Sequence, residues 1–282
     1  MGLNVIFVFP KSSRRSCAIV LLYNQFIMGS RFVMKKILLV AFVLFLAGCS
    51  KDIDFEAMEK NSAEEIFATG KAEMAAGNYS DAVKVFEELE RLYPYSKLTA
   101  EAQLATGDCN YKAKKYDEAI LAYEIFVKTH PIHDKVPYAI YMLGLINYEQ
   151  MPIIERDQES TVMSLSYFNE LCTRYPESEY IKDAKAKIEV LKQQIAGREV
   201  YVARYYQKRG NYAAAIGRLN SVIDSYSDTI HAPEALHRLI ECYISMGFYD
   251  EAATVNKVLQ GKYKTSNWAE YARKLLIKQK DK

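Results

Sequence analysis

The sequence lacks the short motifs with which many enzymes hold a nucleophile, a catalytic metal or a phosphate. Its 282 residues contain no G-x-S-x-G nucleophile turn, no H-E-x-x-H metal pair and no G-x-x-x-x-G-K-[ST] phosphate loop. Histidine is scarce, with four residues, and His130 and His133 lie close together beside a proline. No cysteine or carboxylate cluster completes a zinc site there, so we expect this pair to pack in a loop. The chain is therefore expected to be neither an enzyme nor the holder of a cofactor.

Basic charge has no surplus once the N-terminal segment is set aside. Residues 1–48 contain six of the 37 lysines and arginines and none of the 35 acidic residues. The remaining 234 residues therefore carry 31 basic against 35 acidic side chains, a net charge of −4. Proteins that bind nucleic acids normally show a basic patch or stripe, which this balance does not indicate. Nucleic acid is not an expected partner.

The apolar run Ile37–Leu46 is too short to cross a membrane, because a spanning helix needs about 20 apolar residues. Two lysines precede the run, and the small residues Ala47 and Gly48 lie directly before Cys49. A basic start, a short apolar core and small residues are typical of a secretory signal. A cysteine at this place resembles the lipobox of bacterial lipoproteins. We interpret residues 1–33 as an over-called start or an extended n-region, 34–48 as a lipoprotein signal peptide, Cys49 as the lipidated residue and 49–61 as the lipidated N-terminus and linker.

Glycine and proline are few, with 12 and 7 residues, but several recur at a fixed spacing. Gly70, Gly107 and Gly144 are 37 residues apart, and so are Pro94 and Pro131. A glycine, then A-x3-F or a variant of it, then a proline is typical of tetratricopeptide repeats. No sustained strand alternation is present. The sequence therefore predicts an all-α solenoid of about five helix-turn-helix repeats, with repeats 1–3 in residues 62–177 and repeats 4–5 plus a terminal helix in residues 178–282.

The repeat marks have expected physical roles. Small residues such as Gly70 let two antiparallel helices approach closely, and aromatic residues such as Phe86 are expected to fill the space between neighbouring pairs. Gly77, Gly210 and Gly247 are expected in the turns between helices, where a permissive backbone is needed. A pair of helices cannot bury its apolar face alone, so stacking of the repeats makes the core.

Two segments depart from the regular period. Eight residues around 151–158 are inserted between the two helices of the third repeat. From Ser178 to Gly210 the sequence is longer than one repeat helix needs, and from Ala184 onward only Gly197 offers a break. This leaves two alternatives: one long helix that bridges the two halves of the solenoid, or two ordinary helices interrupted at Gly197.

Three cysteines besides Cys49 lie about 60–70 residues apart within apolar helical patterns. Three thiols cannot all pair, so we expect Cys109, Cys172 and Cys242 to be unpaired residues of the core.

Local strings, added to the lipobox and the repeats, resemble one family: BamD, also called ComL, the outer-membrane lipoprotein of the β-barrel assembly machinery. The resemblance covers residues 49–270. The strings are Arg91-Leu92-Tyr93-Pro94-Tyr95-Ser96, His130-Pro131-Ile132-His133, Tyr138 to Leu145, Arg156-Asp157-Gln158, Arg174 to Tyr180 and Val202 to Gly210.

The resemblance implies a non-catalytic scaffold, lipid-anchored on the periplasmic face of the outer membrane. It implies as partners a BamA-like β-barrel subunit, other lipoproteins of the complex and unfolded outer-membrane proteins. Arg218 matches the position where the family carries an arginine at the BamA contact, and Tyr95 and Ser96 are candidates for the peptide pocket of the N-terminal repeats. Ser50, which is not an aspartate, favours export to the outer membrane. The alternative is a repeat lipoprotein that recruits peptidoglycan hydrolases.

Overall fold

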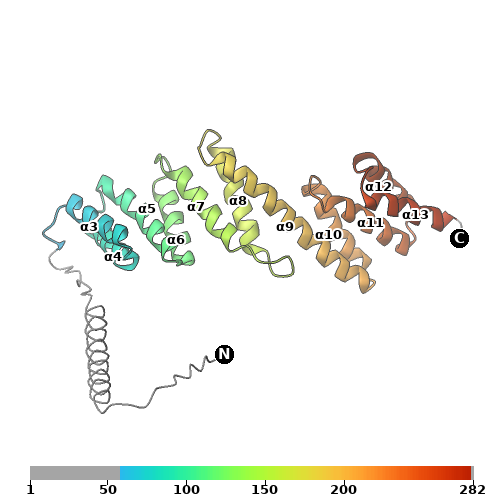
Figure 1. Ribbon diagram of the computed structural model, residues 1–282, viewed down its shortest axis with the longest axis horizontal. Helices are drawn as coiled ribbons and strands as arrows, with labels where there is room; N and C mark the ends of the chain where they lie inside the picture. Colours follow the sequence, from blue (N-terminus) through green and yellow to red (C-terminus); the bar gives the residue numbers. More distant parts are fainter. Residues whose placement is uncertain (1–57, 281–282) are drawn as a thin grey trace, which may run out of the picture. The chain divides into compact units, whose positions relative to one another are not determined.

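The computed structural model describes residues 58–280, which form eleven α-helices joined by turns (Figure 1). The expected all-α repeat fold is confirmed for this part of the chain. The helices are α3 (Ala63–Ala76), α4 (Tyr79–Leu92), α5 (Lys97–Lys112), α6 (Tyr116–Thr129), α7 (Val136–Glu149), α8 (Glu159–Arg174), α9 (Ile181–Lys208), α10 (Tyr212–Ser225), α11 (Ala232–Met246), α12 (Tyr249–Lys262) and α13 (Asn267–Lys280).

The helices begin where the sequence supplies capping chemistry. Ser62 and Glu65 form a reciprocal capping box at the start of α3, and the Ser96 hydroxyl accepts a hydrogen bond from the Leu98 amide at the start of α5. Prolines occupy the first turn of α7 and of α11, where an amide hydrogen is not needed. These signals place the first helix of four repeats.

Successive helices pack against each other in chain order from α3 to α13. The first helices of adjacent repeats also touch, as α3 does α5 and α9 does α11. Each repeat therefore contacts its neighbours, which is the packing of a solenoid. In this scheme α13 follows five complete pairs as a single helix.

A glycine beneath an aromatic ring holds the two helices of each of the first three repeats together. A Cβ atom added to Gly107 would lie 2.7 Å from the Tyr123 ring, and one added to Gly144 would lie 2.6 Å from Phe168. Gly70 lies equally tightly against Phe86. The sequence predicted such rings between neighbouring pairs, whereas each ring packs on a glycine of its own repeat.

The fourth and fifth repeats carry different pairs at these positions. Ala203 and Leu219 replace glycine and ring in the fourth repeat, and Ile240 and Asn256 replace them in the fifth. As the residue on the first helix becomes larger, the residue on the second becomes smaller. This exchange keeps the volume between the helices similar, and it explains why the aromatic motif weakens toward the C-terminus.

The expected turn glycines have the left-handed backbone that only glycine adopts without strain. Gly77, Gly210 and Gly247 have φ angles of +84°, +75° and +80°. In the second repeat Lys114 takes this place, with φ +60°.

Helix α9 is one continuous helix of 28 residues, so the first of the two alternatives is correct. Gly197 lies inside it and is buried. The helix packs against α7 and α8 on one side of the chain sequence and against α10 and α11 on the other (Figure 1). It therefore joins the third repeat to the fourth and fifth.

The three cysteines from Cys109 onward are free, as expected. Cys109 and Cys242 are buried, and burial raises the pKa of each to about 11. Their thiols are therefore protonated at neutral pH and unreactive. Cys172 is half-buried.

The proposed lipidation site Cys49, the signal peptide 34–48 and residues 1–33 lie outside the described residues. Between residues 58 and 280, no helix combines the length and the hydropathy that crossing a bilayer requires.

Candidate functional site: partner-binding surfaces

Tyr95 and Ser96 lie in the turn between α4 and α5, where the structure brings them together. The Tyr95 side chain is 100% exposed, which is unusual for a tyrosine. Ser96 caps α5, so its hydroxyl already has a partner. Beside this turn a cavity of about 480 Å³ opens toward the start of α3. It is lined by Ser62, Ala63, Glu64, Leu92, Tyr93, Pro94, Tyr95 and Ser96.

A second exposed apolar residue occupies the equivalent turn of the next repeat. Ile132 follows Tyr95 by 37 residues and is 99% exposed. Sequence reasoning missed it, although the 37-residue period that identified the repeats also pairs these two positions. Tyr95 and Ile132 together form what we call the turn-edge pair.

A groove on helices α4, α5 and α6 combines apolar and acidic residues. Its volume is about 360 Å³, and Leu121 and Ile125 of α6 are exposed in it. Glu87, Glu90 and Glu118 also line it. Such a groove suits a segment with apolar side chains and positive charge.

Arg218 lies on α10 and is exposed. Its guanidinium Nη1 is 3.2 Å from the Glu199 carboxylate of α9, with which it forms an ion pair. An exposed pair of this kind contributes at most about 1 kcal/mol to stability. Arg218 belongs to the fourth repeat and Tyr95 to the turn after the first, so the structure does not bring these two candidates together.

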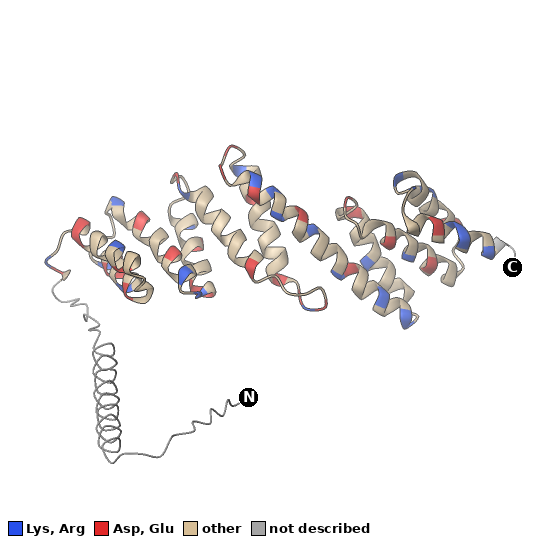
Figure 2. Cartoon of the chain, viewed as in Figure 1, with Lys and Arg blue, Asp and Glu red and all other residues tan. Residues whose placement is uncertain are grey.

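Charge is mixed on the described part of the chain. Lysine and arginine residues alternate with acidic residues along the helices in Figure 2. No face of one sign stands out in that view, which agrees with the balanced composition.

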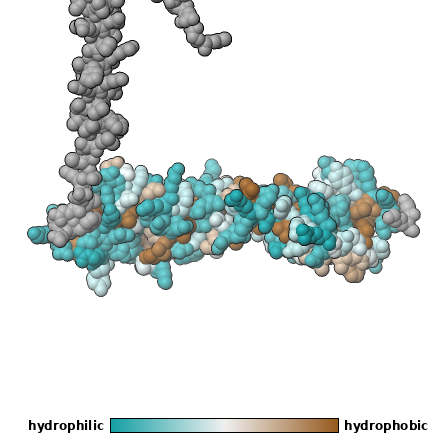
Figure 3. Space-filling view, turned by 90° about the horizontal axis from the view of Figure 1, so that it is seen from below, coloured by the Kyte–Doolittle hydropathy of each residue, from teal (hydrophilic) through white to brown (hydrophobic). Residues whose placement is uncertain are grey.

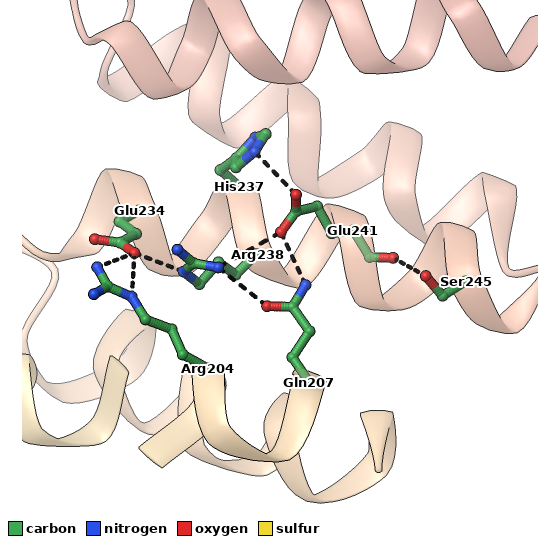
Figure 4. A network of polar contacts seen from close by, with 7 residues as sticks. All are labelled: Arg204, Gln207, Glu234, His237, Arg238, Glu241 and Ser245. Atoms are coloured by element: carbon green, nitrogen blue, oxygen red, sulfur yellow. Dashed lines mark hydrogen bonds and ion pairs between the residues drawn. The ribbon is translucent and has the colours of Figure 1, made fainter. Parts of the chain in front are cut away.

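Sequence reasoning missed a polar network between α9 and α11 (Figure 4). The buried Glu234 carboxylate accepts hydrogen bonds from Arg204 Nε at 2.7 Å and from Arg238 Nε at 2.6 Å. Burial raises the pKa of Glu234, but the hydrogen bonds from the two guanidinium groups outweigh it and lower this pKa. Its members are 30 residues apart in sequence, a separation that no local motif reveals.

The network extends to the terminal helix through His237. The His237 ring is buried and lies 5.3 Å from the ring of Trp268 on α13, and Arg238 lies 5.8 Å from the same ring. The Nε2 atom of His237 is 3.5 Å from Glu241, whereas its Nδ1 atom has no hydrogen-bond partner among the described residues. Aromatic packing therefore fixes α13 against α11.

The inserted loop of the third repeat is fastened to α9. Gln194 donates a hydrogen bond to the Pro152 carbonyl at 2.7 Å, and Arg198 donates one to the Glu155 carbonyl at 2.8 Å. Within the loop, the buried Gln158 amide donates to the Ile153 carbonyl at 2.9 Å. The loop is thus part of the junction between the third and fourth repeats.

His130 and His133 pack against Phe126, with ring centroids 5.5 and 5.3 Å away. His130 also forms a hydrogen bond with Gln103 at 3.0 Å. Across residues 58–280, His, Cys, Asp and Glu side chains form no group of three or more that could hold a metal ion. The pair therefore has a packing role.

Comparison with known proteins gives a consistent result. A family described as YfiO, outer membrane lipoprotein, matches residues 59–278. The outer membrane protein assembly factor BamD of Caulobacter vibrioides is 35% identical over 233 residues, which are 82% of this chain and 76% of that protein. BamD of Neisseria meningitidis serogroup A is 34% identical over 254 residues, or 85% and 95% of the two chains. Among solved structures, the P58(IPK) TPR domain has a TM-score of 0.41 and 15% identity, covering 78% of this chain and 67% of that one.

Proposed function

The chain belongs to the BamD family of outer membrane protein assembly factors, which are non-catalytic outer membrane lipoproteins, and from this premise we propose that it is a docking scaffold. Its first repeats bind unfolded outer-membrane proteins, and its fourth repeat docks on a BamA-like barrel subunit. Cys49 carries the lipid that holds the scaffold on the periplasmic face of the membrane, where other lipoproteins join the complex.

The full exposure of Tyr95 beside a cavity is the observation that carries this proposal. A tyrosine offers a large apolar ring and a hydroxyl, so it binds extended peptide without a deep pocket. Ile132 adds a second apolar contact on the neighbouring turn. An unfolded barrel strand presents alternating apolar side chains, which such contacts can accept.

The Arg218–Glu199 pair supports the second half of the proposal. Both groups are near the surface where α9 packs on α10, and the guanidinium is half-exposed. A carboxylate of a partner can replace or join Glu199 with little loss, because the internal pair is weak. Charges of this kind mainly set the rate and specificity of association.

Site-specific photocrosslinking in cells tests the proposal. A photoreactive residue at Tyr95 is expected to capture segments of outer-membrane barrel proteins, and one at Arg218 is expected to capture the barrel subunit. Lys185, exposed on α9, is the control position and should capture neither. Recovery of only peptidoglycan hydrolases at both positions would favour the alternative of a cell-wall adaptor and reject a barrel-assembly role.

A further inference from the structure

Helix α13 occupies the position of the first helix of a sixth repeat. Helices α12 and α13 reproduce α4 and α5 with a shift of 170 residues. The buried Leu89 of α4 corresponds to the buried Leu259 of α12, and Ala102 of α5 corresponds to Ala272 of α13. In the N-terminal repeats α6 packs next, but no described helix follows α13.

The groove beside α13 is the counterpart of the groove on α4, α5 and α6, without the third helix. Four positions that line the N-terminal groove return, after the same shift, as Ala253, Lys257, Arg273 and Leu276. These residues line a cavity of about 810 Å³, which is larger than the 360 Å³ of the N-terminal groove. Its walls come from α12 and α13 alone. The volume is larger because the place filled by α6 in the earlier repeat is open.

The open groove is apolar in its middle. Tyr249 of α12 is 51% exposed and Ile277 of α13 is 56% exposed, and both line it. Gln279 donates a hydrogen bond to the Tyr249 hydroxyl at 3.2 Å and so ties α13 to the start of α12. Figure 3 shows hydrophobic surface at the end of the described part that carries these helices. Contiguous exposed apolar surface of this kind marks an interaction site.

The charges at the groove differ from those of its N-terminal counterpart. Lys257 stands where α4 has Glu87, and Arg273 stands where α5 has Gln103. Neither cation forms an ion pair within residues 58–280, and one carboxylate, that of Asp250, lines the same groove. The balance of charge therefore favours an occupant with carboxylates at both positions.

We propose that an acidic amphipathic helix of a partner protein binds between α12 and α13 and takes the place of the second helix of a sixth repeat. Its apolar stripe covers Tyr249, Leu276 and Ile277, and its carboxylates face Lys257 and Arg273. This is helix-in-groove recognition, in which residues spaced three and four apart provide the anchors.

The repeat rule also specifies the residue that faces Ile277. Position 277 is equivalent to Gly107, which lies under a ring, and to Ile240, whose counterpart on the second helix is Asn256. A large residue on the first helix is thus matched with a small or medium residue on the second. The partner helix therefore presents no aromatic ring at this point.

Photocrosslinking from position 277 in the full lipidated chain tests the proposal in cells. The expected product joins this position to an acidic segment of another protein, with apolar residues spaced three and four apart. Its yield should fall about ten-fold in Lys257→Glu/Arg273→Glu, a loss typical of reversed charges at an interface. The control Lys182→Glu/Lys185→Glu reverses two exposed lysines of α9 and should leave the yield unchanged. A crosslink to a second copy of this chain, to its own residues 1–57 or to lipid would overturn the proposal, as would no crosslink.

A binding measurement keeps the test independent of the partner's identity. The probe is a stapled 14-residue helix with leucine and alanine on one face and glutamates placed to meet Lys257 and Arg273. Fluorescence anisotropy should show it binding about ten-fold more tightly than the same helix with lysines in place of glutamates. Ile277→Asp should abolish binding while thermal unfolding stays at the wild-type temperature. Equal affinities for the acidic and basic helices would reject the acidic occupant.

Discussion

Gly197 of α9 lies directly against His231, the residue that precedes α11. A Cβ atom on Gly197 would be 3.0 Å from His231 Nε2 and 3.1 Å from Ile154 Cδ1 of the inserted loop. One position on α9 therefore receives both the loop of the third repeat and the start of the fifth. Burial lowers the pKa of His231, so its ring is neutral where the three segments meet.

This contact predicts that Gly197 tolerates no larger side chain. Glycine to alanine inside a helix normally gains up to about 1 kcal/mol. At Gly197 the crowding against His231 and Ile154 should cancel this gain, and Gly197→Val should lower the free energy of unfolding by about 1–3 kcal/mol. Urea unfolding followed by circular dichroism measures both changes.

Gly217 is the matched control, because it lies in α10 with no atom within 4 Å of an added Cβ. Gly217→Ala should raise the free energy of unfolding by up to about 1 kcal/mol. Equal stabilisation by Gly197→Ala and Gly217→Ala would show that the junction is not tightly packed.

The glycine–ring pairs predict a specific rescue. Gly70→Ala pushes a methyl group into the buried ring of Phe86 and should cost about 1–3 kcal/mol. Adding Phe86→Leu creates the alanine–leucine pair that the fourth repeat uses at Ala203 and Leu219. The double variant should therefore be more stable than the two single changes sum to, by about 0.5–3 kcal/mol. Additive free energies of unfolding would mean that the exchange between repeats is not compensation.

The repeat core could be read from the sequence because its signals are local and periodic. The 37-residue spacing of Gly70, Gly107 and Gly144 predicted the helix pairs that the structure shows. Gly197 could not be resolved the same way, because a glycine that breaks a helix and one that admits a neighbour look alike in sequence. What decides between them is contact with Ile154 and His231, which lie 43 residues before and 34 residues after it.

The candidate site was only partly accessible to sequence reasoning for a related reason. Ile132 was within reach of the repeat period that pairs it with Tyr95, but a lone isoleucine after a proline carries no sign of exposure. The Arg204–Glu234 pair depends on how α9 and α11 face each other. Such side-chain partners follow from tertiary packing and not from spacing along one helix.

The Glu234 network predicts a dependence of stability on pH. The pKa of Glu234 in the folded chain lies below its usual value of 4.5, so its contribution is present above pH 4.5 and is lost as the pH falls further. Glu234→Gln should lower the free energy of unfolding at pH 7 by about 1–3 kcal/mol, the range for hydrogen bonds to charged groups. Urea midpoints measured from pH 3 to pH 7 should fall less steeply for Glu234→Gln than for the wild type. Glu270→Gln, which changes an exposed ion pair, is the control and should follow the wild-type curve.

The Arg218–Glu199 pair separates docking from stability. If the guanidinium binds the barrel subunit, Arg218→Ala should reduce co-purification of that subunit, while the free energy of unfolding changes by less than about 1 kcal/mol. Glu199→Gln removes the internal partner and leaves Arg218 free, so co-purification should be kept or increased. Equal losses in the two variants would indicate that the pair acts by holding α9 to α10 and not by contacting a partner.

The turn-edge pair predicts a loss of client binding without a loss of stability. Tyr95 and Ile132 are fully exposed, so Tyr95→Ser and Ile132→Ser should each change the free energy of unfolding by no more than about 0.5 kcal/mol. A bound peptide would bury these side chains, and losing a buried ring or branched chain at an interface costs roughly 1–2 kcal/mol, about ten-fold in affinity. Anisotropy with a labelled peptide that has the alternating pattern of a barrel strand measures the affinity. Val190→Ser on α9, also exposed and apolar, is the control and should bind as the wild type does. Unchanged affinity in the Tyr95→Ser/Ile132→Ser double variant would move the client site elsewhere, with the acidic groove on α4, α5 and α6 as the next surface to test.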